Sequence, residues 1–168
     1  MADSRKAPFH FWRFFFSLQG RVSRGPFLAF ELITRLGLLA GYQGLRYIPG
    51  LAPVTIGLYS LPLALISLIV LWPNFALLFK RFHDAGQTGL WALPYFAPFF
   101  YGVYIGFSTL QAGFHKHALA ASPPYVTWAL IAINYGLILV AALLPGTRTA
   151  NRFGPRPGHL PAPVQDVF

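Results

Sequence analysis

Three long stretches of this chain contain no charged residue. The first lies between Arg46 and Lys80 and is 33 residues long, and the stretches from Asp84 to Lys116 and from Lys116 to Arg148 enclose 31 residues each. A helix needs roughly 20 predominantly apolar residues to cross the hydrocarbon core of a bilayer. Each stretch is therefore predicted to hold one transmembrane helix together with its flanking turns.

These stretches and one earlier segment predict an all-α, polytopic membrane protein with four transmembrane helices. Pro26 suits the opening turn of the first helix, and a Pro-Gly pair at 49–50 closes it. A second Pro-Gly pair at 145–146 stops the last helix. Prolines inside the second and third helices are tolerated in membranes because neighbouring helices satisfy the freed backbone groups. The helices form one transmembrane domain, residues 26–146, and cover about 26–48, 54–79, 89–110 and 125–144.

The segments on either side of this domain are predicted to lie outside the bilayer core. Residues 1–25 contain an apolar run, 9–18, that is too short to span and is interrupted by Arg13. Its bulky aromatic side chains are of the kind that settle at the headgroup boundary, so we expect an interfacial segment. The alternative is the frayed start of the first spanning helix. The tail, residues 147–168, contains several prolines and is predicted to be extended or disordered.

The composition agrees with a chain embedded in lipid. Hydrophobic residues make up 55% of the 168 residues and charged residues only 10%, against roughly 25% charged in ordinary soluble domains. The formal charge of +9 is expected to reflect orientation in the membrane and contact with anionic lipids. Nucleic acid is not an expected partner, because proteins that bind it place Lys and Arg on a solvated face.

Lysine and arginine are concentrated on one side of the predicted bundle. The opposite side carries only Arg46 and Lys116. Because cytoplasmic loops carry the excess of Lys and Arg, both termini and the 80–88 loop are predicted to be cytoplasmic, in a multi-pass protein of the plasma membrane. The ten cations on the predicted cytoplasmic side are Arg5, Lys6, Arg13, Arg21, Arg24, Lys80, Arg81, Arg148, Arg152 and Arg156.

Three short motifs combine glycine with charged residues. The first is Gly-Arg-Val-Ser-Arg at 20–24, the second is Lys-Arg-Phe-His-Asp-Ala-Gly-Gln-Thr-Gly at 80–89, and the third joins the Pro-Gly pair at 145–146 to Asn-Arg-Phe-Gly-Pro at 151–155. In this order they resemble the DUF805 family of bacterial inner-membrane proteins, over residues 11–157. The resemblance implies a small polytopic protein of the inner membrane with no established biochemical activity. Leu28 and Leu90 stand where aromatic residues are common in the family, and are expected to change packing alone.

All three motifs fall on the predicted cytoplasmic side, and two interpretations of them remain open. In the first they form a structural clasp, in which Asp84 pairs with an arginine, His83 satisfies a backbone group and Asn151 caps a helix end. In the second, the excess of cations over the single carboxylate forms a site for an anion or a lipid headgroup. The cations that would line this site are Arg21, Arg24, Lys80 and Arg81. The full set of candidate residues adds His83, Asp84, Asn151 and Arg152.

Two charged residues lie inside the first predicted helix. Glu31 and Arg35 are four residues apart, so they share a helical face and can form an ion pair. Arg35 approaches the midplane of the bilayer, where an unpaired charge costs on the order of 3 kcal/mol. The pair is predicted either to be structural or to belong to a proton or ion path. The polar companions available in the other helices are Asn74, Asn134, Tyr59 and Tyr135.

Small residues predict where helices approach each other closely. Gly37 and Gly41 form a GxxxG pattern in the first helix, and Gly102 and Gly106 form another in the third. Such patterns bring backbones together within a chain or between chains. They therefore allow a second copy, or another membrane protein, as a partner.

Three functional classes follow from these residues. The leading hypothesis is a non-enzymatic membrane protein that acts through interaction, as a scaffold or accessory subunit with a cytoplasmic-side site for anionic lipid headgroups or a partner. The alternatives are an oligomeric transporter or channel component that uses Glu31 and Arg35, and a lipid-modifying enzyme with His83 as base and Asp84 as its orienting group. No cofactor or metal is expected, because a metal needs three or four preorganised ligands and the only other histidines on this side are His10 and His159.

Overall fold

The protein is built from helices, as a computed structural model shows for residues 10–47, 53–111 and 123–158. Within these ranges there is no strand, and the only β-type pairing is an isolated bridge between Asn151 and Gly154. The predicted all-α class is therefore confirmed. The elements in chain order are α1 (Phe11–Phe16), α2 (Arg24–Arg46), α3 (Pro53–Asp84), the 3-10 helix η1 (Gly89–Phe96), α4 (Ala97–Gln111) and α5 (Pro124–Leu143).

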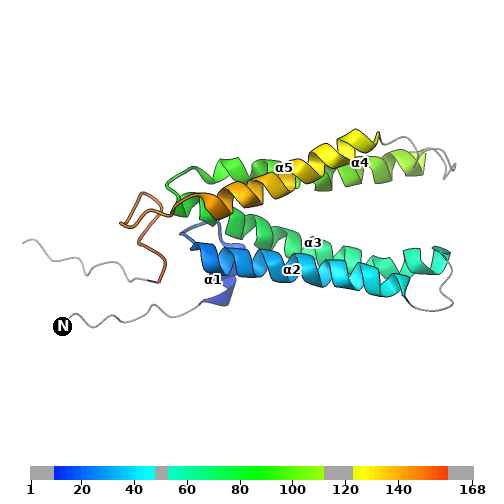
Figure 1. Cartoon of the computed structure of the whole chain (residues 1–168), viewed down its shortest axis with the longest axis horizontal. Coiled ribbons are helices and arrows are strands. Elements are labelled where there is room, and N and C mark those ends of the chain that lie inside the picture. Colours follow the sequence, from blue (N-terminus) through cyan, green and yellow to red (C-terminus); the bar gives the residue numbers. More distant parts are fainter. Residues whose placement is uncertain (1–9, 48–52, 112–122, 159–168) are drawn as a thin grey trace, which may run out of the picture.

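The long helices pack as two pairs. α2 lies beside α3, and α4 lies beside α5, while η1 and α5 connect the second pair to α3 (Figure 1). α1, the turn after α3 and the segment after α5 all lie at one end of the bundle, on the left in Figure 1. This end, which we call the motif end, therefore brings together three motifs that are far apart in the sequence.

α1 is a short helix of its own. Residues 17–23, which separate it from α2, are not helical, so α1 is not the start of the first long helix. The indole Nε1 of Trp72 donates to the carbonyl of Phe16 at 3.1 Å, and the rings of Phe15 and Phe30 lie 4.9 Å apart. Phe11 and Trp12 remain exposed on the outside of the bundle. The location of α1 at a membrane surface remains a prediction.

Two helix boundaries differ from the predicted ones. α3 continues to Asp84, so residues 80–84, predicted to lie in a loop, are helical. The helix continues because Phe82 is buried in the core and the charged residues beside it find hydrogen-bond acceptors. The third predicted helix begins as η1, and the α-helix starts only at Ala97. Pro94 lies inside η1, where it supplies no N–H for an α-helical ladder.

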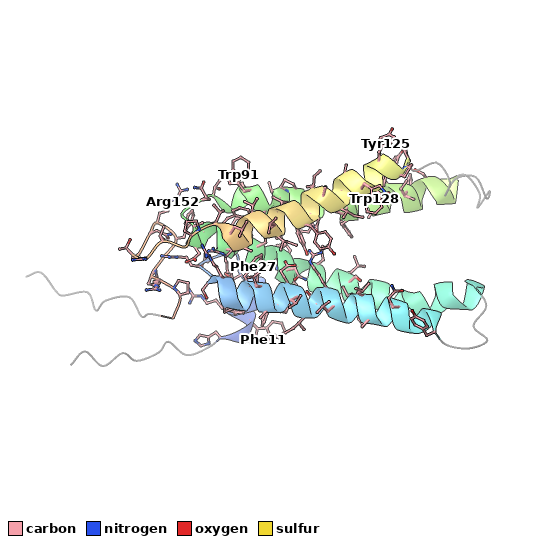
Figure 2. All side chains as sticks on the ribbon, in the orientation of Figure 1. Phe11, Phe27, Trp91, Tyr125, Trp128 and Arg152 are labelled. Atoms are coloured by element: carbon pink, nitrogen blue, oxygen red, sulfur yellow. The ribbon has the colours of Figure 1, made fainter. Side chains whose placement is uncertain are left out.

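Several charged side chains are buried and many large apolar side chains are exposed, which is the reverse of a soluble protein. Arg81 and Asp84 are 0% and 5% exposed, whereas Ile33, Ile69 and Trp128 are 68–69% exposed. Figure 2 shows Trp128, together with Trp91 and Tyr125, on the outside of the helices. An apolar surface of this extent requires contact with lipid or with other protein. The buried apolar residues are Val22, Phe27, Phe75, Ala76, Leu77, Leu78, Phe82, Ala92, Tyr95 and Ala141.

Two segments are long and apolar enough to cross a membrane, by length and composition. They are Leu65–Asp84 within α3 and Pro124–Leu143, which is the whole of α5, with mean hydropathies of 1.5 and 2.1. Little of α5 is fully buried inside the bundle, as expected for a helix with one side facing lipid. The structure thus agrees with a membrane-associated helical protein.

Candidate functional site

Asp84, the last residue of α3, is the centre of a cluster of charged residues at the motif end. Arg21 donates Nε and Nη2 to its Oδ1 at 3.0 and 2.8 Å, and Arg81 donates Nη1 to its Oδ2 at 2.7 Å. Both oxygens of the carboxylate are therefore paired with a guanidinium. A buried carboxylate with two cationic partners is far more favourable than one without any.

Arg21 also fixes the segment that follows α5. Its Nη1 donates to the carbonyl oxygens of Thr149 and Gly154, at 2.8 and 3.3 Å, and its Nη2 donates to that of Thr147 at 2.6 Å. Every nitrogen of this guanidinium has a partner within the protein, and the residue is buried. Arg21 thus connects the start of α2, the end of α3 and the C-terminal segment.

The C-terminal end of α3 is capped by the same segment. The backbone N–H of Thr147 donates to the carbonyl of Asp84 at 2.8 Å, and Nδ2 of Asn151 donates to the carbonyl of His83 at 2.9 Å. The last carbonyls of a helix have no partner within the helix, so these bonds replace water. Asn151 therefore occupies the capping position that the clasp interpretation predicts.

His83 joins the cluster by stacking and by a backbone contact. Its ring lies parallel to that of Phe153, with centroids 3.7 Å apart and an interplanar angle of 5°. Its Nδ1 lies 3.2 Å from the carbonyl oxygen of Gly20. The His83 ring has no hydrogen bond to the carboxylate of Asp84, whose oxygens are taken by arginines, so the structure does not form the His-Asp pair considered for catalysis. We call Arg21, Arg81, His83, Asp84, Thr147, Asn151 and Phe153 the clasp.

Two further cations bind helix ends beside the clasp. Lys80 donates Nζ to the carbonyls of Arg13 and Phe14 at 2.8 and 2.6 Å, which secures α1 against α3. Arg24 donates Nε to the carbonyl of Leu144 at 3.1 Å and Nη2 to that of Leu143 at 3.0 Å, and Arg81 also donates to Leu144. Cations are favourable at these positions because the C-terminal end of a helix carries partial negative charge.

The predicted anion site is therefore only partly available. Arg21, Lys80 and Arg81 are buried and donate to protein acceptors, so of the four predicted cations only Arg24 is exposed. Arg152 is exposed and lies over the ring of Phe153 at 4.6 Å.

A pocket of about 450 Å³ lies beside Arg24, and Arg148 and Arg156 also line it. The sequence places these two arginines in the excess of Lys and Arg on the predicted cytoplasmic side. Nothing in it separates them from arginines that bond within the fold.

The part of the chain that contains the clasp residues matches a known protein family. A model of a family described as proteins of unknown function, DUF805, matches residues 15–155. The chain belongs to the DUF805 family. No curated protein and no solved structure matches the chain. The resemblance predicted from the three motifs is therefore confirmed, and Arg156 lies just beyond the matched region.

The charged pair of α2 is present in this DUF805 protein and is part of a network. Nε of Arg35 donates to Oε2 of Glu31 at 2.9 Å, and Nη2 of Arg35 donates to Oδ1 of Asn134 in α5, also at 2.9 Å. Nδ2 of Asn134 lies 3.3 Å from the carbonyl of Tyr95, and the guanidinium lies 4.7 Å from the ring centroid of Tyr135. The network thus joins α2, η1 and α5.

A cavity of about 260 Å³ adjoins this network, between the two helix pairs. Its lining includes Arg35, Asn74, Asn134 and Tyr135, so three of the four predicted companions lie here, while the side chain of Tyr59 is outside the described part. Oε1 of Glu31 is buried and has no hydrogen-bond partner among the described residues. The remaining polar lining residues are Thr34, Ser67 and Tyr95. They could not be singled out from the sequence, because hydroxyl groups are common in the helices of membrane proteins.

The other predicted features are less informative. Across residues 10–47, 53–111 and 123–158, no three His, Asp or Glu side chains are close enough to hold a metal ion; His159 lies outside these ranges. Gly37 and Gly41 lie on α2, and Gly102 and Gly106 lie on α4. A Cβ at Gly37 or Gly102 would have no described neighbour within 4 Å, so these two glycines do not mark a helix contact within the described part of one DUF805 chain.

Replacing Gly146 by alanine is expected to destabilise this DUF805 protein by about 1–3 kcal/mol. A Cβ at Gly146 would run into the carboxylate of Asp84, so the clasp would have to open or shift. Thermal unfolding of the purified protein, followed by tryptophan fluorescence, measures the effect. Gly37→Ala is the matched control, because its Cβ has free space and alanine favours a helix. Equal melting temperatures for the two variants would contradict the expected clash.

Proposed function

We propose that the protein is a multi-pass protein of the bacterial inner membrane, with four crossings and both termini in the cytoplasm. It acts without catalysis, as a scaffold or an accessory subunit, with a site for anionic lipid headgroups or a partner on the cytoplasmic side. The observation that carries this proposal is the combination of a saturated charged cluster with an exposed apolar exterior. The charged groups of the motifs hold the fold together, while the exterior is available for lipid and protein contact.

The dimensions of the helices support four crossings. α2 has 23 residues, which corresponds to a length of about 35 Å at 1.5 Å per residue. η1 with α4 also covers 23 residues, in 8 and 15, and reaches about 38 Å because a 3-10 helix rises about 2 Å per residue. Both lengths exceed a hydrocarbon core of about 30 Å. By composition, α3 and α5 are apolar enough to cross a membrane. All four long segments are therefore able to span the hydrocarbon core of a bilayer.

The clasp supports a non-enzymatic role. A general base or a nucleophile needs a side chain that can reach a substrate. Asp84 and Arg21 are both buried and paired with each other, and His83 is buried and stacked on Phe153. These groups are therefore engaged in holding α2, α3 and the C-terminal segment together.

The proposed topology is tested with single cysteines, because the chain has no cysteine of its own. Ala150→Cys, in the exposed segment after α5, is expected to react with a membrane-impermeant maleimide only after the cells are lysed. Ala118→Cys, in the predicted outer loop, is expected to react in intact spheroplasts. The same reactivity for both positions, or the reversed pattern, would contradict four crossings with cytoplasmic termini.

A second candidate function is supported by the network around Glu31. Oε1 of Glu31 is buried without a described partner, and a cavity with polar lining lies next to Arg35. Buried ionisable residues of membrane helices often belong to proton or ion paths. We propose, as the alternative, that Glu31 and Arg35 form part of such a path in an oligomer.

A further inference from the structure

The pocket beside Arg24 lies where α2 begins and α5 has ended. It has a volume of about 450 Å³, and its lining includes Ser23, Arg24 and Gly25 from the start of α2 and Arg148 and Arg156 from the segment after α5. Asp84, at the end of α3, also lines the pocket. The three arginines are all exposed. The pocket is thus an accessible cavity that is lined by cations from two distant parts of the chain.

No acidic group in the described part of the chain is left to neutralise these arginines. The described ranges contain only two acidic residues, Glu31 and Asp84. Glu31 pairs with Arg35. Asp84 lines the pocket, but Arg21 and Arg81 already take both of its carboxylate oxygens. The three arginines of the pocket therefore form a local charge excess that an external anion would neutralise.

Arg24 is already held in place for such an anion. Its Nε and Nη2 donate to the carbonyls that end α5, while its Nη1 has no hydrogen bond to a described residue. A guanidinium that is fixed in this way loses little side-chain entropy when it binds an anion. Arg148 and Arg156, in contrast, make no hydrogen bond or ion pair with described residues, so their donors are also available.

The start of α2 adds to the positive electrostatic potential of the pocket. The side chain of Ser23 makes no capping hydrogen bond, so the first backbone N–H groups of this helix are not satisfied by the residue at the capping position. The N-terminal end of a helix carries partial positive charge and favours phosphate. A Cβ at Gly25 would have no described neighbour within 4 Å, which leaves room for a ligand above the helix end.

We propose that this pocket binds the phosphate of an anionic phospholipid. The inference rests on the proposed function in one respect, that the motif end lies at a membrane surface. A lipid is favoured over a soluble anion because the apolar outer faces of α2 and α5 adjoin the pocket, with Leu28, Leu139 and Leu143 exposed on them. The arginines hold the headgroup while acyl chains lie along these faces.

The test is lipid binding by the full-length protein, measured by native mass spectrometry with phosphatidylglycerol and, for comparison, zwitterionic phosphatidylcholine. The Arg148→Gln/Arg156→Gln variant is expected to lose phosphatidylglycerol affinity roughly 25-fold, at about fivefold for each arginine near a membrane surface. Its affinity for phosphatidylcholine and its melting temperature should not change, because neither arginine bonds to the fold. Retention of the parent affinity would overturn the proposal.

Arg152→Gln is the matched control, since Arg152 lies in the same segment and is exposed but does not line the pocket. It is expected to bind phosphatidylglycerol as the parent does, and an equal loss in both variants would show that general surface charge is responsible. Displacement of the lipid by millimolar inorganic phosphate would assign the pocket to a soluble anion and would overturn the proposal that it binds a phospholipid. These measurements do not depend on orientation in a cell, so a failed topology experiment and a failed lipid experiment are distinguishable.

Discussion

The Asp84→Asn variant is expected to unfold at a melting temperature roughly 10 °C below that of the parent protein. The change leaves two buried guanidinium groups, those of Arg21 and Arg81, without their carboxylate. Breaking a buried ion pair by removing one partner costs about 3–5 kcal/mol, and in a domain of this size 1 kcal/mol corresponds to roughly 2–4 °C. Thermal unfolding in one detergent, followed by tryptophan fluorescence, gives the comparison.

The matched control for this variant is Gln87→Ala, in the turn directly after α3. Its side chain makes no hydrogen bond in the described part of the structure, so a change of polarity near the clasp is expected to leave the melting temperature within about 1–2 °C of the parent's. If Asp84→Asn melted as the control does, the clasp would not be what holds the motif end together.

The Arg35→Leu variant is expected to be destabilised by about 3 kcal/mol, the second-largest effect. It leaves Glu31, which is 2% exposed, without its partner. In the proposed topology α2 crosses the membrane, where an unpaired charge costs about this amount on insertion scales. It also removes the bond to Asn134 that connects α2 to α5. Melting temperatures of the parent and the variant in the same detergent measure the effect.

The double variant Glu31→Gln/Arg35→Leu distinguishes a structural role of the ion pair from a role in transport. It removes both charges, so at least half of the lost stability is expected to return. If the pair is structural, proteoliposomes of the parent and of the double variant should show the same proton flux, measured with an interior pH dye. A proton flux that is present in the parent and absent in a stable double variant would establish the proton path. If the double variant did not regain stability, the structural role of the Glu31–Arg35 pair would be contradicted.

The sequence predicted the helices well because their determinants are local. Runs of apolar residues and Pro-Gly pairs act over a few positions, and Glu31 and Arg35 meet because they are one helical turn apart. The 3-10 start of the third predicted helix was missed, although its prolines were noted. A proline removes one donor in any helix, and which backbone conformation replaces the lost bond depends on the surrounding helices.

The clasp was predictable as a kind of contact but not as a specific set of bonds. Asp84 in an apolar segment requires a cation, yet the sequence offers several, and the fold selects Arg21 and Arg81. Lys80 was expected at an anion site, but α1 folds back and supplies two carbonyls for its ammonium group. Whether a cation is free depends on contacts between distant segments, and for this reason Arg148 and Arg156 could not be singled out.

The clasp has a consequence for how such a chain inserts into a bilayer. Arg21 bonds to residues 63 and 126 positions further along the chain, Asp84 and Thr147, and two long helical segments lie between each consecutive pair. In the proposed topology of four crossings, these bonds form only when every intervening segment has crossed completely, since a single missed crossing would leave the partners on opposite sides of the bilayer. The clasp therefore discriminates between correctly and incorrectly threaded chains, and it can close only after the last helix has been synthesised.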